Sequence, residues 1–233
     1  MIEQYKRNGY CVLEDVVGRV RAQKDDVHAL LRTVNADSND EYRALCRVLA
    51  AQTSTMQQFL SQDLLNAVVA LGIHRPLFLT APVAHVMAPD LWHEGVGAHQ
   101  DWPALQSGLD TIVAWMPLFD VGLDDYPIEV APGSHVFGML PNKAGEHINE
   151  VEIHGMEFVP VQMKAGDVLL FSAFTVHRTR TPGKGFRIAY SHRYENAEDK
   201  SFLDRGCYSA QSRVIDREIK WAPTPEQVRE IFA

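Results

Sequence analysis

The sequence predicts a mainly β protein with flanking helices, built on one antiparallel sandwich or barrel. After "HRP" at 74–76, short apolar or alternating runs are separated by Gly, Pro and Asp, as in "TIVAWMPLFDV" and "DVLLFSAFTVHRT". No segment long enough for a crossover helix lies between these runs, which favours antiparallel strands over βαβ units. A length of 233 residues fits a single domain of this kind.

The helices are expected on either side of the β core. "GYCVLEDVV" at 9–17 follows the chain start and predicts a short first strand. The stretch 39–71 predicts an amphipathic packing helix, because Tyr42, Leu45 and Leu49 recur at helical spacing. "PTPEQVREIFA" predicts a capped final helix. The expected organisation is a helical N-terminal annex at 20–75, a jelly-roll-sized core at about 77–194 and a C-terminal tail at 195–233.

Composition excludes several classes of protein. The net charge is −8, and no basic stripe is visible, so a nucleic-acid partner is not expected. Cys11, Cys46 and Cys207 are far apart and match neither a disulfide framework nor a zinc module, which fits a reducing cytoplasm. The first residues lack the apolar run of a signal peptide, and no stretch has the length and apolarity of a membrane span. A cytoplasmic protein with no membrane partner is expected.

Two segments supply candidate metal ligands. In an extended "AHQDW", His99 and Asp101 project to one face, while Gln100 and Trp102 project to the other. His177, in "FTVHRT", offers a third ligand from a late strand. Two imidazoles and one carboxylate form the facial ligand set of non-haem Fe(II) oxygenases, which leaves coordination positions open for other groups.

A candidate anion site follows ten residues after the last histidine. Alternation places Arg187, Ala189, Ser191 and Arg193 on one face of a strand. An arginine followed on its own face by two small residues leaves a pocket with a guanidinium at one end, which suits a carboxylate. Thr179 shares the face of the third ligand and offers a hydroxyl to the same carboxylate.

The order of these motifs resembles the phytanoyl-CoA dioxygenase-like (PhyH) family of Fe(II)/2-oxoglutarate oxygenases. The resemblance rests on "HQD" at 99–101, "APGSH" at 131–135, "KAGDVLLF" at 164–171, His177 and Arg187. "NGYCVLEDVV" and "TIVAWMPLFD" add to it, and together these motifs span most of residues 8–194. The resemblance implies a double-stranded β-helix core of the jelly-roll, cupin-like kind.

The resemblance also implies the ligands. His99, Asp101 and His177 would bind Fe(II), Arg187 would pair with the far carboxylate of 2-oxoglutarate, and Thr179 stands where the family often has a hydroxyl partner. Further cosubstrate contacts are expected within 78–86. The implied reaction uses O2 to hydroxylate a C–H bond of a small-molecule metabolite, with release of succinate and CO2.

Two features qualify this expectation. Related halogenases replace the carboxylate ligand with a small residue, so Asp101 favours hydroxylation over halogenation. The turn in "DDYPIEVAPGSH" departs from the glycine-containing turn usual in relatives, so the loop on the substrate side is expected to differ.

Other residues have a functional and a structural interpretation. Trp102, Trp115, His93 and His135 are possible substrate or neighbouring contacts, although the tryptophans also suit the core and His135 also suits a turn. Charged side chains near the last ligand are expected in solvent, with an anionic substrate group as the alternative; they are Arg178, Arg180 and Lys184.

Two other functions stay open at this stage. The same ligands could serve a cupin-like metal-dependent isomerase or lyase that needs no 2-oxoglutarate, although Arg187 and its small neighbours argue against this. A catalytically silent small-molecule binding protein on a jelly-roll scaffold is the third class, since fold does not fix function. The sequence does not predict an oligomeric state.

Overall fold

The computed structural model describes most of the chain. The described residues are 1–17, 39–51, 53–78, 82–89, 95–143, 147–148, 153–201 and 221–233. The predicted annex is therefore observed only from residue 39 onward, and its first part lies outside the described residues.

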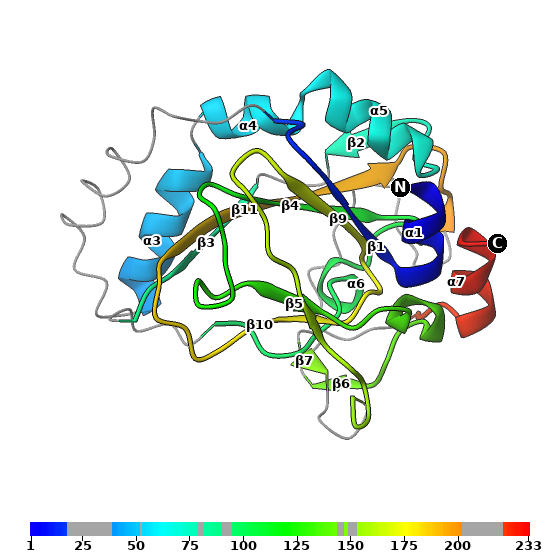
Figure 1. Cartoon of the computed structure of the whole chain (residues 1–233). Coiled ribbons are helices and arrows are strands. Elements are labelled where there is room, and N and C mark those ends of the chain that lie inside the picture. The colour runs from blue at the N-terminus through cyan, green and yellow to red at the C-terminus, as the bar shows by residue number, and fades with distance from the viewer. Residues whose placement is uncertain are drawn as a thin grey trace.

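Two antiparallel sheets form the centre of the molecule (Figure 1). Their strands are β1 Tyr10–Leu13, β2 Pro76–Phe78, β3 Val83–Met87, β4 Ile112–Pro117, β5 Ile128–Val130, β8 Val159–Pro160, β9 Val168–Ser172, β10 His177–Thr179 and β11 Arg187–Asn196. The larger sheet has the order β1-β9-β4-β11-β2, and β3 also pairs with β11. The smaller sheet has the order β10-β5-β8. A separate hairpin joins β6 Asn142–Lys143 to β7 His147–Ile148.

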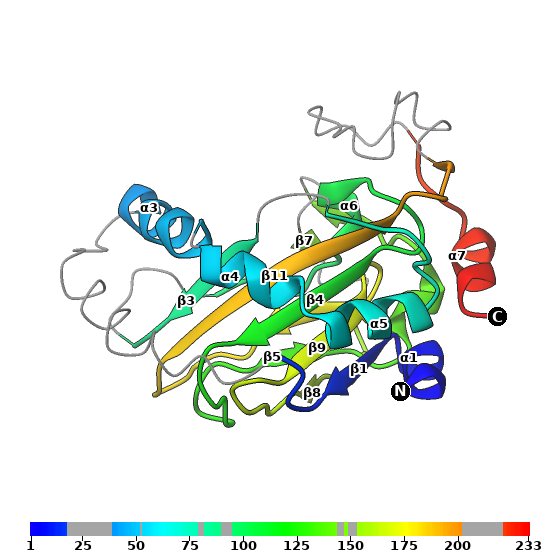
Figure 2. The ribbon, with the colours of Figure 1, turned by 90° about the horizontal axis from the view of Figure 1, so that it is seen from above.

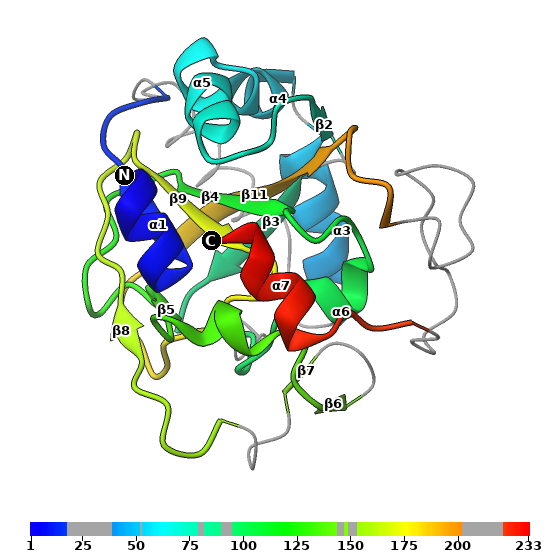
Figure 3. The same ribbon diagram turned by 90° about the vertical axis from the view of Figure 1, so that its right-hand side faces the viewer.

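Helices cover the outer face of the larger sheet. Seen from above, α4 Thr53–Phe59 and α5 Gln62–Ala70 lie over its strands, and α3 Asn39–Ala50 lies beside β3 (Figure 2). Two further helices, α1 Ile2–Asn8 and α7 Pro225–Ile231, lie near each other at one end (Figure 3). Two short helical turns complete the set: α6 Trp102–Leu105 and the 3₁₀ turn η1 Ser134–Phe137. The mainly β fold with flanking helices is thus confirmed, as the double-stranded β-helix type.

The larger sheet is buried on both faces, and alternate residues of each strand pack against different layers. In β4, Ile112, Ala114 and Met116 pack in the cluster under the helices, whereas Val113 and Trp115 pack in the cluster between the sheets. Successive side chains of a strand point to opposite faces, so one apolar run supplies both layers. This explains why the run "IVAWMP" is apolar throughout rather than alternating.

The predicted helix at 39–71 is three helices in the structure, which corrects the expectation of one. Near each break between these helices, a polar side chain forms a hydrogen bond with the backbone. The Thr55 hydroxyl donates to the Leu49 carbonyl at 3.4 Å, and the Ser61 hydroxyl caps α5 by accepting from the Leu64 N–H at 3.4 Å. Ser and Thr side chains compete with the helix for backbone groups in this way and favour caps over helix interiors.

The helix at the C-terminal end was predicted from the sequence, whereas the helix at the N-terminal end was not. The final helix is confirmed, with a capping box in which the Thr224 hydroxyl and the Gln227 side chain bond each other's backbone N–H. The sequence did not indicate α1, which ends at Gly9 in a left-handed conformation with φ of 77°. The first strand, β1, follows directly, as expected.

No helix in the described part of the chain is both long and apolar enough to cross a membrane.

Candidate active site

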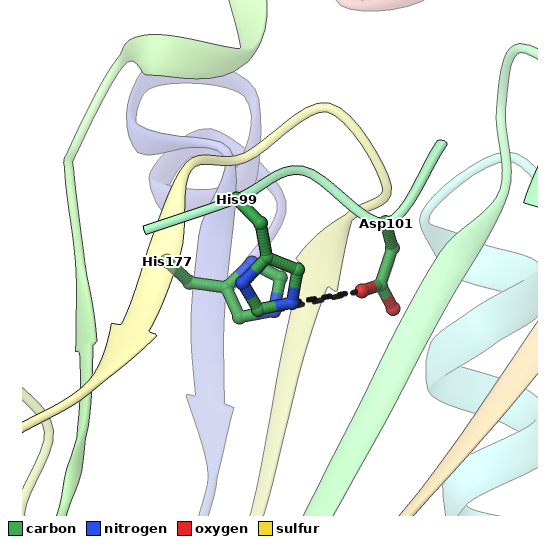
Figure 4. Close-up of side chains that lie close together, drawn as sticks. All are labelled: His99, Asp101 and His177. Atoms are coloured by element: carbon green, nitrogen blue, oxygen red, sulfur yellow. Dashed lines mark ion pairs between the residues drawn. The ribbon is translucent and has the colours of Figure 1, made fainter. Parts of the chain in front are cut away.

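Three side chains that the sequence singled out as ligands converge between the two sheets (Figure 4). One donor atom each from His99, Asp101 and His177 lies within 4.8 Å of the other two. The Oδ1 atom of Asp101 is 3.5 Å from Nε2 of His99 and 3.6 Å from Nε2 of His177. The three donor atoms therefore face one common point.

Backbone pairing brings the two histidines together. His99 and His177 form an isolated antiparallel bridge, in which each N–H donates to the other's carbonyl at 2.9 and 3.0 Å. His177 begins β10, which is paired in turn with β5. The imidazole rings consequently lie with their centroids 4.1 Å apart.

Asp101 reaches the site from a backbone that differs from the expected one. Its φ of −75° and ψ of −31° are helical, and it precedes the first turn of α6. The expectation of an extended "HQDW" is therefore corrected at Asp101, although its carboxylate still joins the histidines. Gln100 points away and anchors the segment: its amide donates to the carbonyls of Gly138 and Phe174 at 2.8 and 2.7 Å and accepts from the Leu140 N–H at 2.8 Å.

Hydrogen bonds set the ring nitrogen that each histidine presents. Nδ1 of His99 is 2.7 Å from the Gly97 carbonyl, and Nδ1 of His177 is 3.0 Å from the Thr175 carbonyl. A carbonyl oxygen only accepts, so each Nδ1 carries the proton and each Nε2 keeps a lone pair toward the common point. Burial, and secondly the neighbouring His99, lower the pKa of His177 to about 3, which keeps that ring in the neutral, ligating form.

Asp101 is held as a carboxylate. Burial by itself would raise its pKa, but the Arg193 guanidinium outweighs burial and holds the pKa well below its usual range. Arg193 donates to Oδ2 of Asp101 from Nη2 at 2.7 Å and from Nε at 3.1 Å. Two neutral imidazole nitrogens and a carboxylate oxygen are a donor set that suits a divalent iron ion.

Arg187 lines the same pocket with unused hydrogen-bonding capacity. Its side chain is buried, and its guanidinium carbon lies 5.4 Å from the ring centre of Trp115. Nη1 donates to the Tyr126 carbonyl, whereas the buried Nε has no hydrogen-bond partner among the described residues. Burial lowers the pKa of Arg187 to about 10, still well above neutral pH. A buried guanidinium with a free donor fits an incoming carboxylate, as 2-oxoglutarate would supply.

Other predicted residues that line this pocket are Thr179 and Trp115. The Thr179 hydroxyl accepts from the Val96 N–H at 3.2 Å, which fixes the loop before the first ligand. His85 also lines the pocket, with Nε2 at 3.0 Å from the Ser191 hydroxyl. It falls within 78–86, the range expected to hold further cosubstrate contacts.

Trp102 and His135 are not among the residues that line the pocket, which favours the structural interpretation of both over a contact with substrate. Trp102 points to the other side of the segment, stacks on Phe174 with centroids 5.4 Å apart and donates to the Ser107 carbonyl at 3.1 Å. His135 is buried in η1, where Nε2 lies 3.1 Å from the Lys6 carbonyl and the ring packs edge-on against Phe232. Its structural interpretation as a turn residue is the one that fits. His93 lies outside the described residues.

Arg178 and Arg180 are not simply solvated charges. They donate to the carboxylate of buried Glu129 at 2.7 and 3.1 Å. Cross-strand pairing places Arg178 directly opposite Glu129, on the face opposite His177 and Thr179. Both arginines therefore neutralise Glu129 on the outer face of the smaller sheet, and Arg178 also borders the pocket that holds the three ligand candidates.

A two-histidine, one-carboxylate centre between the sheets of a double-stranded β-helix, with a buried arginine beside it, defines an Fe/2-oxoglutarate oxygenase-type fold and site. The family model described as "Phytanoyl-CoA dioxygenase (PhyH)" matches residues 5–189, which is more than half of the chain. The chain therefore belongs to the phytanoyl-CoA dioxygenase family.

Solved structures support the same fold. The epimerase SnoN in complex with Fe3+, α-ketoglutarate (2-oxoglutarate) and nogalamycin RO is 21% identical, with a TM-score of 0.54 over 84% of this chain and 82% of that chain. SnoK, a non-haem α-ketoglutarate-dependent carbocyclase from nogalamycin biosynthesis, is 17% identical, with a TM-score of 0.56 over 93% of both chains. AviO1 from Streptomyces viridochromogenes Tue57 is 18% identical, with a TM-score of 0.60 over 85% of this chain and 94% of that chain. No curated protein sequence matches the chain.

Proposed function

We propose that this protein is a non-haem Fe(II)- and 2-oxoglutarate-dependent dioxygenase that hydroxylates a C–H bond of a small-molecule metabolite. The observation that carries the proposal is the cluster of three donor atoms within 4.8 Å of one another, with buried Arg187 lining the same pocket. Membership of the phytanoyl-CoA dioxygenase family supports it. The protein is proposed to act in the cytoplasm, in keeping with its cysteine usage.

Each pocket residue has a role in this proposal. His99, Asp101 and His177 hold the iron, and their Nδ1–carbonyl bonds and the Arg193 contact keep the donor atoms in place. Arg187 binds the far carboxylate of 2-oxoglutarate, to which Thr179 adds its hydroxyl. With 2-oxoglutarate, the bound metal supplies the activation of O2, in which one oxygen atom enters the substrate and the other enters succinate as CO2 leaves.

The outcome at the substrate has a second candidate. Asp101 provides a carboxylate ligand, which argues against halogenation. SnoN is named an epimerase and SnoK a carbocyclase, so epimerisation or ring closure on the same centre is the alternative to hydroxylation. These outcomes differ in product: hydroxylation adds one oxygen to the substrate, whereas epimerisation leaves its mass unchanged.

The first experiment tests the cofactors without needing the substrate. Anaerobic protein with Fe(II) is titrated with 2-oxoglutarate, and a weak visible charge-transfer band is expected as the cosubstrate chelates the metal. Iron binding without this band would favour an isomerase or lyase that needs no 2-oxoglutarate. Failure to bind iron after careful reconstitution would favour a silent binding protein.

The second experiment identifies the reaction. Metabolite pools are screened for substrate-dependent release of succinate, and the product is then weighed by mass spectrometry. A gain of one oxygen atom is expected. An unchanged mass, or a loss of two hydrogens, would replace hydroxylation with one of the other outcomes.

A further inference from the structure

Arg193 is held from two sides within the pocket. Nη2 and Nε donate to Oδ2 of Asp101 at 2.7 and 3.1 Å, and Nη1 donates to the Ser191 hydroxyl at 2.9 Å. The Ser191 hydroxyl is also 3.0 Å from Nε2 of His85 on β3. Three donors of one guanidinium are therefore engaged in a chain that joins β11 and β3 to the segment that carries Asp101.

This chain determines which oxygen of Asp101 is free. Oδ2 receives both contacts from Arg193, whereas Oδ1 lies 3.5 and 3.6 Å from the Nε2 atoms of the two histidines. Because the backbone at Asp101 is helical rather than extended, strand pairing does not fix this side chain as it fixes His99 and His177. Its direction depends on the contact with the guanidinium.

We propose that Arg193 is a positioning residue, which holds Asp101 so that a single carboxylate oxygen is presented to the metal. The proposal rests on the proposed function, since it concerns the same metal site. Ser191 is the anchor that keeps the guanidinium in register with Asp101. Partners of this kind orient metal ligands, and their loss lowers metal affinity.

A simpler role for Arg193 leads to the opposite expectation. If the guanidinium only neutralised a buried carboxylate, removing a cation near a divalent ion would strengthen metal binding, because like charges repel. If the guanidinium positions Asp101, removing it weakens metal binding despite the lost repulsion. The direction of the change therefore separates the two roles.

The test measures Mn(II) binding to the full chain, from the loss of the free-ion signal in electron paramagnetic resonance. We expect Arg193→Gln and Arg193→Lys each to weaken Mn(II) binding by about tenfold or more, within the range known for partners of metal ligands. Lysine keeps the charge but not the planar fork that reaches Asp101 and Ser191 together. Unchanged or tighter binding in Arg193→Gln, or wild-type binding in Arg193→Lys, would overturn the proposal.

The chain offers a matched control. Arg180 also donates to a buried carboxylate, that of Glu129, but on the outer face of the smaller sheet. Arg180→Gln removes an arginine–carboxylate pair without touching the pocket, so Mn(II) affinity should match the wild type. An equal loss of affinity in Arg180→Gln would attribute the effect to general weakening of the fold, against the proposal.

A milder variant covers the case in which Arg193→Gln does not fold. Ser191→Ala removes the anchor and leaves the contact with Asp101, so a several-fold loss of Mn(II) affinity is expected at a melting temperature close to the wild type. The Co(II)-loaded variant should also show an altered visible spectrum as the carboxylate turns. Wild-type affinity and spectrum would overturn the proposal.

The wild-type measurement separates this proposal from the proposed function. If the wild-type chain binds no Mn(II) or Fe(II), the metal site itself is wrong. If the wild type binds and the Arg193 variants bind equally well, only the positioning role is wrong.

Discussion

The two faces of β11 carry neighbouring residues with separate tasks. Arg187, Ser191 and Arg193 line the pocket, whereas Ile188 and Tyr190 pack in the core under the helices. The separation follows from the alternation of side chains along a strand. A substitution at a pocket-facing position of β11 should therefore affect ligand binding, whereas a substitution at the next position should affect the stability of the fold.

The helix-covered face is built for stability. Ile188, Tyr190 and Tyr194 are fully buried, and the Tyr194 hydroxyl donates to the Phe59 carbonyl at 2.5 Å. His192 lies among aromatic rings on this face, and within the part of the chain that the structure describes neither ring nitrogen has a hydrogen-bond partner. Burial lowers the pKa of His192 to about 3, so the ring packs as a neutral, nearly apolar group.

The largest expected effect comes from removing a ligand on the pocket side. His99→Ala should lower Fe(II) affinity by more than about 100-fold, because even partners of ligands typically cost 10–100-fold. Since His99 is partly exposed and Asp101 keeps its ion pair with Arg193, the melting temperature of the metal-free protein should stay close to the wild type. Metal titration and thermal unfolding check both halves. Retained iron binding with 2-oxoglutarate turnover would remove His99 from the centre.

An effect on stability alone is expected on the opposite face. Ile188→Ala should lower the free energy of unfolding by about 3 kcal/mol, because it opens a cavity at a fully buried position. Denaturant unfolding measures the loss, and Mn(II) affinity of the folded variant should not change. A clear loss of metal affinity would show that the two faces are coupled.

The smallest effect is expected at Arg187, which is adjacent to Ile188 but faces the pocket. Arg187→Lys should weaken 2-oxoglutarate binding by about tenfold, equivalent to one charge-assisted hydrogen bond of about 1.5 kcal/mol, because lysine lacks the fork. Titration of the charge-transfer band measures this affinity, and Fe(II) affinity should change little. Equal cosubstrate affinity in both proteins would remove Arg187 from its role.

Local periodicity predicted much of this arrangement. Alternation placed Arg187, Ala189, Ser191 and Arg193 on one face, and the structure places His192 on the other. The spacing in "HQD" and the later His177 indicated the three ligand candidates from the sequence alone. Such features depend on neighbours in the chain, which a sequence displays directly.

Contacts between distant segments could not be predicted in the same way. Arg193 and Asp101 are 92 positions apart, and the local sequence around each residue does not indicate that the two form an ion pair. The same holds for Glu129 with Arg178, and for His135, whose place depends on the packing of both chain ends. The helix breaks near Thr55 and Ser61 were missed because an apolar stripe continues across them.

The reciprocal backbone bonds between His99 and His177 have a consequence for loading the protein with iron. These bonds join backbone groups only, so the spacing of the two imidazoles does not depend on a bound ion. Little conformational entropy of the chain is then lost when an ion binds. This favours metal binding to a preformed site over metal binding that is coupled to folding. Chelators should accordingly strip the ion and leave a folded protein that takes it up again.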